Sequence, residues 1–172
     1  WPPMTLREPV SIRFRSRIPT PQMEILWPTP AYHTPGDAEM DYAAQFLEPI
    51  LEGRLPRRNV LSVGVQQVSS LHGSYFRIAL ATARDVDPQQ YLSVIDDALN
   101  QLRTEVIAEE RFELIRGAVT SFAGESPWTR ASRMGRAVLF GVEPRTSSWE
   151  SARYGAVSRE AVRSAARRYL SP

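Results

Sequence analysis

The chain has 172 residues, 42% of them hydrophobic, and a formal net charge of +2, so its length and composition favour a single domain with one substantial core over residues 1–172. It contains no cysteine, which excludes disulfides, thiolate catalysis and zinc sites built on sulfur. No apolar run approaches the ~20 residues that cross a bilayer, and the weak net charge does not favour nucleic acid as a partner.

The first 21 residues are a proline-rich lead-in in which we predict one strand. Val10, Ile12 and Phe14 alternate with polar residues in "VSIRFRS", as they would in a half-buried strand. Because the chain begins with Trp1 and not with methionine, we expect it to be a fragment of a longer polypeptide. A second strand is predicted for "MEILW", residues 23–27, between flanking prolines.

A helix and a β-hairpin are predicted next. Apolar residues recur at helical spacing from Met40 to Leu51, with Asp37 as the expected N-cap and Pro49 near the helix end. "NVLSVGVQQVSS" and "SYFRIALATA" alternate as strands do, and "LHG" between them reads as a turn. The two strands are therefore expected to pair as a hairpin.

The rest of the chain is predicted to be helical. Asp87 as N-cap and Pro88 at the first helical position open a helix whose apolar stripe runs to Leu102. Further helices are expected at 109–122, 129–141 and 147–154, and Ser158 caps a last helix with its own apolar stripe. Strands followed by a run of helices predict an α+β fold, with an antiparallel or mixed sheet covered on one face by helices.

Taken alone, the residues reveal no active site. His33 and His72 lie far apart in predicted loops, where we expect exposed turn residues, and neither H-E-x-x-H nor H-x-x-E-H occurs. No G-x-S-x-G turn presents a serine, and no glycine-rich phosphate loop follows a strand. Carboxylate pairs such as Asp96 with Asp97 lie beside helical stripes, where exposure to solvent is expected.

The basic residues are all arginine and gather at 57–58, 130–136 and 163–168. Acidic residues such as Asp85, Asp96 and Glu109 are interspersed along the fold, so solvated helix faces are the expected interpretation of these groups. RNA binding on an α+β sheet stays the distant alternative.

Several stretches together resemble a known pattern. "MEILWPTPAYHTPGDAEMDYAAQFLEPIL" resembles the strand, turn and helix that open the carboxyl-terminal type of domain in the insulinase/pitrilysin zinc metallopeptidases, the family of mitochondrial processing peptidase-like proteins. "HGSYFRIALATARDVDPQQYLSVIDDALNQLR" and "EERFELIRGAVTSFAGE" are similar to the central strand and helices of that domain. "FGVEPRTSSWESARYGAVSREAVRSAARRYLSP" looks like its closing unit, so the resemblance covers residues 23–172.

The resemblance implies a non-catalytic domain with the LuxS/mitochondrial processing peptidase-like metallohydrolase fold. In that family, domains close around a peptide, and zinc is held by an H-x-x-E-H helix in one domain only. Because this chain lacks the motif, the resemblance implies no catalytic residue, metal ligand or cofactor in it, with zinc in a sister domain. The expected partners are that sister domain or subunit and a peptide substrate, with a dimer as one expected assembly.

One segment departs from the family pattern. Related domains carry an arginine and a later tyrosine after the first helix, where both can reach substrate, whereas "EGRLPRRNVLSVGV" is short and has no tyrosine. The pair is not carried over, and Arg54, Arg57 and Arg58 are the substrate-binding candidates that the segment offers. An edge strand of the sheet is also expected to pair with extended substrate.

Two further expectations come from the family analogy. The alternative to a working peptidase domain is a catalytically inactive paralogue that serves as a structural partner. A bacterial periplasm or cell envelope is the expected location.

Overall fold

A computed structural model of the chain describes residues 8–121, 126–141 and 147–171, with the side chains of 147–149 left aside. The elements are β1 (Gln22–Pro28), α1 (Asp37–Arg54), β2 (Val60–Val68), β3 (Tyr75–Thr82), the 3-10 turn η1 (Pro88–Tyr91), α2 (Leu92–Thr104), α3 (Glu109–Thr120), α4 (Pro127–Leu139), α5 (Ser147–Gly155) and α6 (Arg159–Tyr169). This order confirms the predicted α+β class. Residues 1–7 of the lead-in, and Phe122, the expected last residue of the 109–122 helix, lie outside the described residues.

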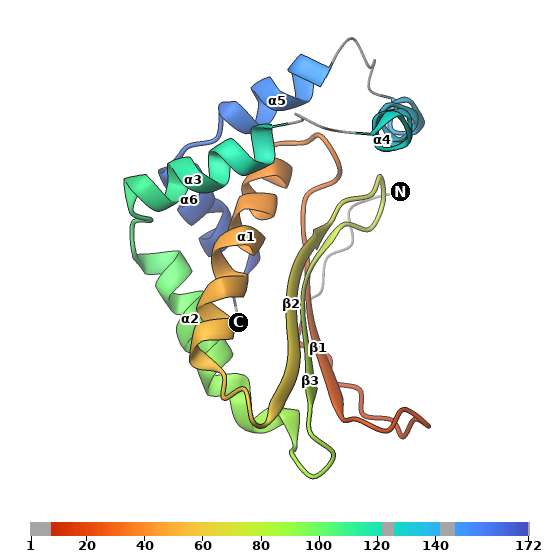
Figure 1. The fold of residues 1–172 in the computed structure, drawn as a ribbon, viewed down its shortest axis with the longest axis vertical. Coiled ribbons are helices and arrows are strands. Elements are labelled where there is room, and N and C mark those ends of the chain that lie inside the picture. The colour runs from red at the N-terminus through yellow and green to blue at the C-terminus, as the bar shows by residue number, and fades with distance from the viewer. Residues whose placement is uncertain (1–7, 122–125, 142–146, 172) are drawn as a thin grey trace.

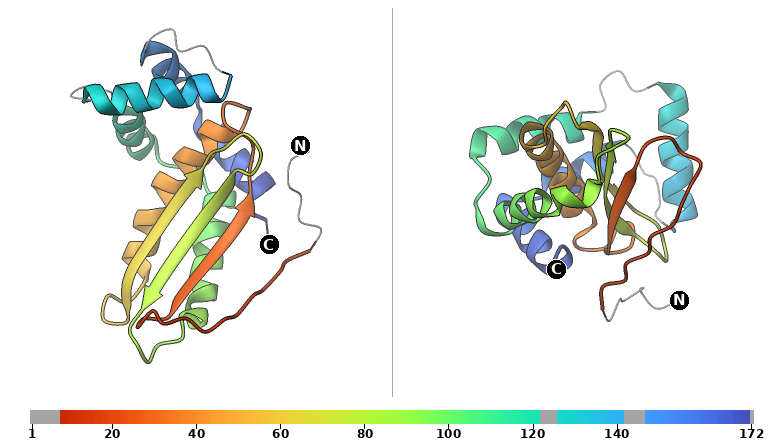
Figure 2. Two further views of the ribbon diagram at one scale, coloured as in Figure 1. Left: turned by 90° about the vertical axis from the view of Figure 1, so that its right-hand side faces the viewer. Right: turned by 90° about the horizontal axis from the view of Figure 1, so that it is seen from below.

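The sheet is antiparallel, with strand order β1-β3-β2. β3 pairs with β1 in the register Ile25 to Ile78 and with β2 in the register Val65 to Ile78, which confirms both the "MEILW" strand and the hairpin. Alternate residues of β3 are buried, and these side chains face the helices. The opposite side of the sheet, called the outer face below, carries no helix packed along it (Figures 1 and 2).

The helices form a layer on one face of the sheet. α1 packs against β2 and is flanked by α2 and α6, while α5 packs on α3 (Figure 1). The side chains between these elements are large and fully buried, including Tyr42, Phe46, Leu51 and Phe76. α4 is the exception, because it overhangs the outer side of the sheet near the upper end of the strands (Figure 1).

The start of α1 corrects one prediction. The N-cap is Gly36 and not Asp37, and the Gly36 N–H donates to the Glu39 carboxylate at 3.0 Å. Gly36 has a φ of 102°, and a Cβ there would come within 2.9 Å of Pro30 and 3.0 Å of Tyr169 on α6. Only glycine meets both conditions without strain. Asp37 therefore enters the first turn, and its carboxylate is available for tertiary contacts.

The strand predicted at residues 10–16 is wrong for this structure. Residues 9–16 form no regular element, and Val10, Ile12 and Phe14 are 68%, 80% and 80% exposed. Alternation makes a segment suitable for a strand but does not supply a neighbour, and within the described chain no strand lies against it. The alternating pattern is present, but no strand of the described chain pairs with it.

The last helix confirms its predicted cap, and Arg167 and Arg168 are exposed as expected for a solvated helix face. The Ser158 hydroxyl accepts from the Ala161 N–H at 3.1 Å, and Val162, Ala165 and Ala166 are buried. Arg159 donates to the Ile107 carbonyl at 3.1 Å, and Arg167 donates to the Arg103 carbonyl at 2.6 Å. Arg167 therefore ties α6 to the last turn of α2, and Arg159 ties it to the segment that joins α2 to α3.

Candidate functional site

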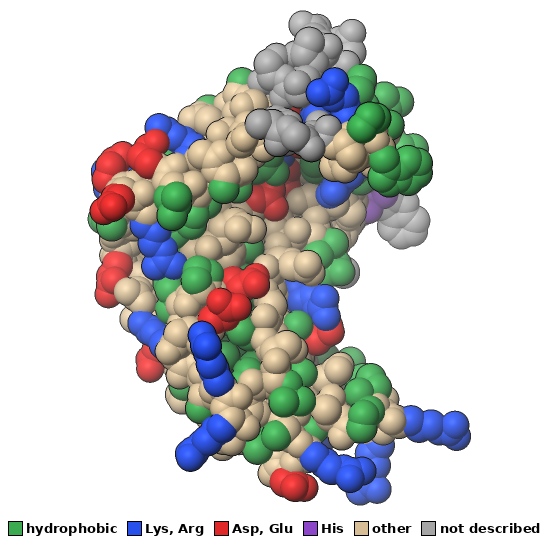
Figure 3. Space-filling model, viewed as in Figure 1, with side chains coloured by type: hydrophobic (Ala, Val, Ile, Leu, Met, Phe, Trp, Pro, Cys, Tyr) green, Lys and Arg blue, Asp and Glu red, His purple; other side chains and the backbone are tan. Residues whose placement is uncertain are grey.

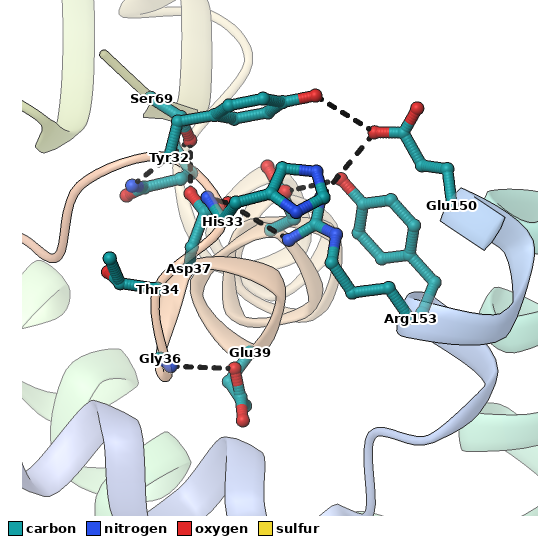
Figure 4. Close-up of polar contacts among 12 residues, drawn as sticks. Tyr32, His33, Thr34, Gly36, Asp37, Glu39, Ser69, Glu150 and Arg153 are labelled. Atoms are coloured by element: carbon teal, nitrogen blue, oxygen red, sulfur yellow. Dashed lines mark hydrogen bonds and ion pairs between the residues drawn. The ribbon is translucent and has the colours of Figure 1, made fainter. Parts of the chain in front are cut away.

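A cluster of charged and phenolic side chains lies where α1 begins and α5 passes over it (Figure 4). It is called the polar cluster below and consists of Tyr32, Asp37, Asp41, Glu150, Arg153 and Tyr154. The loop before α1 shapes one side, because His33 adopts a left-handed φ of 65° and its backbone N–H donates to the Asp37 carboxylate at 3.0 Å. The other Asp37 oxygen accepts from the Ser69 hydroxyl just beyond β2.

Arg153 on α5 joins two buried carboxylates. Its Nη1 lies 2.9 Å from Asp37 Oδ2, and its Nη2 lies 3.6 Å from Glu150 Oε1. The Asp37 and Glu150 side chains are only 0% and 7% exposed, so both charges depend on arginine for compensation. The Tyr32 hydroxyl also donates to Glu150 at 3.3 Å, and burial together with the Glu150 charge raises the pKa of Tyr32 to about 12.

Asp41 and Tyr154 form the second polar pair of the cluster. The Tyr154 hydroxyl donates to Asp41 Oδ2 at 2.7 Å. Burial raises the pKa of Asp41 to about 6, although the hydrogen bond from Tyr154 acts in the opposite direction. Burial and the charge of Asp41 likewise raise the pKa of the Tyr154 hydroxyl well above its usual range. A carboxyl group with this pKa can exchange a proton near neutrality, but its partner is a phenol and no nucleophile.

Two arginines of α4 face the polar cluster. Arg133 pairs with Glu150 at 3.4 Å, and Arg136 donates to the Ser69 carbonyl at 3.1 Å while its guanidinium lies 5.1 Å from the centre of the Tyr32 ring. The solvated face expected for residues 130–136 is therefore wrong for Arg133, whose side chain is 14% exposed, whereas Arg136 stays exposed while it makes these contacts. A void of about 350 Å³ remains beneath α4, lined among others by Gln67, Thr129 and Ser132.

The outward side of α4 is apolar. Trp128, Val138 and Leu139 are 80%, 61% and 78% exposed, and Met134 lies on the same side of the helix. In an ordinary surface helix this stripe would face the core and the arginines would face water. Figure 3 shows the hydrophobic side chains gathered on this overhang, above a hollow in the surface. α4 is thus amphipathic, but its apolar side faces away from the protein.

The outer face of the sheet is hollowed between β1 and β2. Small residues on β2 and β3, namely Ser62, Gly64, Ala79 and Ala81, floor a trough of about 340 Å³. Arg77 and Glu24 form an ion pair across one side of it. Because no described helix covers this face, the trough and the α4 stripe are two unpartnered surfaces on the same side of the molecule (Figures 2 and 3).

The histidines and the arginine candidates lie apart from one another. His72 is exposed in the β2–β3 turn as predicted, whereas His33 is partly buried against Tyr32 at a ring distance of 4.4 Å, which corrects its expected exposure. Burial, with Arg153 nearby, lowers the pKa of His33. No group of three or more acidic or histidine side chains in the described ranges could hold a metal ion.

Arg54, Arg57 and Arg58 lie at the opposite end of α1 from the polar cluster. Arg54 donates to Gln101 at the last turn of the helix, and Arg57 and Arg58 are exposed in the turn that follows. α1 has 18 residues, which at 1.5 Å per residue separates the two ends by about 27 Å. The structure therefore does not bring these candidates to the cluster, and their contact with substrate stays a prediction.

Sequence reasoning missed the polar cluster because its members are distant in the chain. Arg153 and Asp37 are 116 residues apart, and neither stands in a recognisable motif. One signal was present: Arg133 and Arg136 share one side of a helix whose other side carries Trp128 and Leu139. That pattern shows that the two sides differ, but it does not show which side turns inward.

Comparison with models of known protein families and with curated protein sequences finds no match. Solved structures do share the fold. A protease from Helicobacter pylori superposes with a TM-score of 0.80 at 12% identity, covering 91% of this chain and 40% of that one. The inactive peptidase domain of a candidate zinc protease from Bordetella parapertussis gives 0.76 at 20%, covering 94% and 91%. Pitrilysin gives 0.65 at 16%, covering 87% and 17%.

These similarities define the fold of the chain. It has the α+β architecture found in zinc protease and pitrilysin structures and in an isolated inactive peptidase domain, which confirms the fold that the resemblance implied. The chain spans 40% of the length of the Helicobacter pylori protease, so it matches one portion of that larger molecule. Within the described residues, no helix is long and apolar enough to cross a membrane.

Proposed function

We propose that this chain is a non-catalytic domain of an insulinase/pitrilysin-type zinc metallopeptidase. In this role it forms part of the wall of a chamber around a peptide, while a sister domain holds zinc and hydrolyses the peptide bond. The observation that carries the proposal is the fold shared over nearly the whole chain with an inactive peptidase domain.

The polar cluster has a structural part in this proposal. Its carboxylates are engaged by arginine or tyrosine, so the cluster joins α1, α4 and α5 and leaves no side chain in position to attack a peptide bond. Buried ion pairs of this kind favour one arrangement of the elements that carry them. Here the Arg133–Glu150 pair orients α4 with Arg133 inward and its apolar stripe outward.

The α4 stripe and the trough on the outer face are the surfaces that we assign to the sister domain. Exposed apolar stripes of this size mark interaction surfaces, because water contact with Trp128, Val138 and Leu139 is unfavourable. The small residues of the trough let another element approach the sheet closely. Both surfaces lie on the side of the sheet that the helical layer leaves open, where a second domain would close a chamber (Figure 3).

The proposal is tested with the 172-residue chain and the full-length gene product that contains it. Alone, the chain is expected to bind no zinc and to cleave no peptide, whereas the full-length protein binds zinc and hydrolyses an extended peptide. The double variant Trp128→Asp and Leu139→Asp in the full-length protein is expected to lower kcat/KM by at least about tenfold, because charges would enter the interface.

Leu114→Asp is the matched control. Leu114 is 74% exposed on α3, away from the open side, and its replacement is expected to leave kcat/KM within about twofold. Stoichiometric zinc and peptide cleavage by the 172-residue chain alone would overturn the proposal. A full-length protein that contains no zinc and cleaves nothing would instead identify an inactive paralogue.

A further inference from the structure

β1 has one hydrogen-bonding edge that nothing in the described chain covers. Thr82 N–H donates to the Pro21 carbonyl and Thr29 N–H to the Ser74 carbonyl, both at 3.0 Å, so the odd-numbered residues of β1 direct their backbone groups to β3. In an antiparallel strand the alternate residues then point the other way. Gln22, Glu24 and Leu26 therefore present their N–H and C=O groups to open space.

The other edge of the sheet is closed at its centre. On β2 the Val65 N–H points away from β3 and donates to the Glu48 carboxylate of α1 at 3.2 Å. A side chain that occupies the edge in this way blocks a pairing strand. The two edges are thus unequal, and β1 is the one that can accept a strand.

Residues 8–18 lie on the free side of β1 without joining it. Figure 2 shows this segment leaving the lower end of β1 and running beside the strand at an angle. Arg13 fixes it to the body of the protein, because its guanidinium donates to Gln89 at 2.8 Å and lies 3.5 Å from Asp87. The printed sequence shows strand-like alternation here, and Val10, Ile12 and Phe14 remain exposed.

Residues 8–18, which run beside this edge, carry the three arginines Arg13, Arg15 and Arg17 and one acidic residue, Glu8 (Figure 2). Arg15 and Arg17 are exposed and make no ion pair in the described structure, whereas Glu24, the acidic residue on β1, is already paired with Arg77. A second copy of the chain pairing through the same edge would bring these arginines toward their own counterparts. The like charges disfavour that arrangement and favour an acidic strand.

We propose that the edge of β1 binds an extended acidic peptide strand. Its backbone pairs with Gln22, Glu24 and Leu26, its acidic side chains meet Arg15 and Arg17, and the apolar residues at 10, 12 and 14 cover its free side. Pro28, which has no N–H, ends the ladder at the upper end. The idea that this peptide is a substrate of the chamber rests on the proposed function. The binding of an acidic peptide to the β1 edge does not depend on it.

The experiment measures binding of a labelled peptide to the 172-residue chain by fluorescence anisotropy. The probe is a blocked peptide of about seven residues that alternates glutamate and valine, long enough to cover the exposed part of the edge. Leu26→Pro removes an N–H from the free edge and none from the β1–β3 ladder, so it is expected to weaken binding at least about tenfold with an unchanged circular dichroism spectrum.

Leu26→Ala is the matched control, because it removes the side chain and keeps the N–H; it is expected to bind within about twofold of the wild type. The pair Arg15→Ala and Arg17→Ala is expected to weaken binding about threefold or more and to reduce its dependence on salt. The same peptide methylated on alternate backbone nitrogens is expected to lose binding, which keeps the test independent of whether Leu26→Pro folds.

Equal binding of the methylated and unmethylated peptides would overturn the inference. So would a dimer of the 172-residue chain in sedimentation that the Leu26→Pro change dissociates, because a second copy would then occupy the edge. If the peptide does not bind but the full-length protein cleaves peptides with zinc, this inference fails and the proposed function stands. If the peptide binds but the full-length protein contains no zinc and cleaves nothing, this inference stands and the proposed function fails.

Discussion

The two ends of α1 are held to the protein by different forces. At its beginning, Asp37 pairs with Arg153 and accepts from Ser69, and Asp41 accepts from Tyr154, so contacts between particular polar groups decide the packing. At its other end, Leu51 and Leu55 are buried among apolar side chains, and the nearby arginines face solvent. An ion network needs particular partner residues, whereas apolar packing needs only side chains of suitable volume. We therefore expect the beginning of α1 to tolerate few substitutions and its end to tolerate apolar substitutions of similar size.

The largest effect is expected where a buried charge loses its partner. Asp37→Ala leaves Arg153 beside a single, more distant carboxylate and is expected to lower the free energy of unfolding by about 3–5 kcal/mol. Urea unfolding followed by circular dichroism measures the loss. Asp97→Ala, at an exposed position on α2, serves as the control and is expected to change stability by less than about 0.5 kcal/mol. A small loss for Asp37→Ala would mean that the ion network does not hold this end.

The apolar end is expected to respond to lost volume and to nothing else. Leu51 is 0% exposed, and Leu51→Ala is expected to cost about 3 kcal/mol through lost burial and the cavity that remains. The loss should be the same at low and high salt, whereas the loss for Asp37→Ala should vary with salt. Equal salt dependence of the two losses would contradict the proposed difference between the ends.

The pH dependence of stability sharpens the contrast at Asp41. Its pKa in the folded state is raised from 3.8 to about 6, so the folded protein holds a proton that the unfolded chain releases. This contribution to stability is complete below pH 3.8 and is lost as the pH rises through about 6. Because one pKa unit corresponds to about 1.4 kcal/mol, the expected loss is about 2–3 kcal/mol.

The variant Asp41→Asn isolates the effect of the Asp41 charge on stability. The amide oxygen can still accept from the Tyr154 hydroxyl, but no buried charge forms. The variant is expected to match the wild type near pH 4 and to be more stable by about 2 kcal/mol at pH 7, as measured by urea unfolding across that range. A variant less stable than the wild type at pH 7 would show that the ionised carboxylate stabilises the cluster.

The smallest effect on stability is expected at the exposed arginines. Replacing Arg54, Arg57 and Arg58 together with alanine should change the free energy of unfolding by less than about 1 kcal/mol, because these side chains form no buried pair. If they contact substrate as predicted, the same change in the full-length protein raises KM for a peptide several-fold. An unchanged KM would remove them as substrate-binding candidates.

Prediction from sequence succeeded where the signal is local. The strand at "MEILW", the hairpin and the stripe of α6 follow from side-chain periodicity, and the caps Asp87 and Ser158 follow from hydroxyl or carboxylate oxygens that accept the first free N–H groups. The cap of α1 was misplaced by one residue. Gly36 is preferred there because of its left-handed backbone and its contact with Tyr169, and that contact spans most of the chain.

The same limit explains the errors at α4 and at residues 10–16. Both segments carry a clear amphipathic pattern, so the sequence alone determined that each has an apolar and a polar side. Only the tertiary structure decided that Arg133 turns inward to pair with Glu150 and that Arg136 reaches the Ser69 carbonyl. It also decided that Val10, Ile12 and Phe14 have no strand beside them in the described chain. Periodicity depends on neighbours in the chain, whereas the choice of face depends on groups that folding brings from elsewhere.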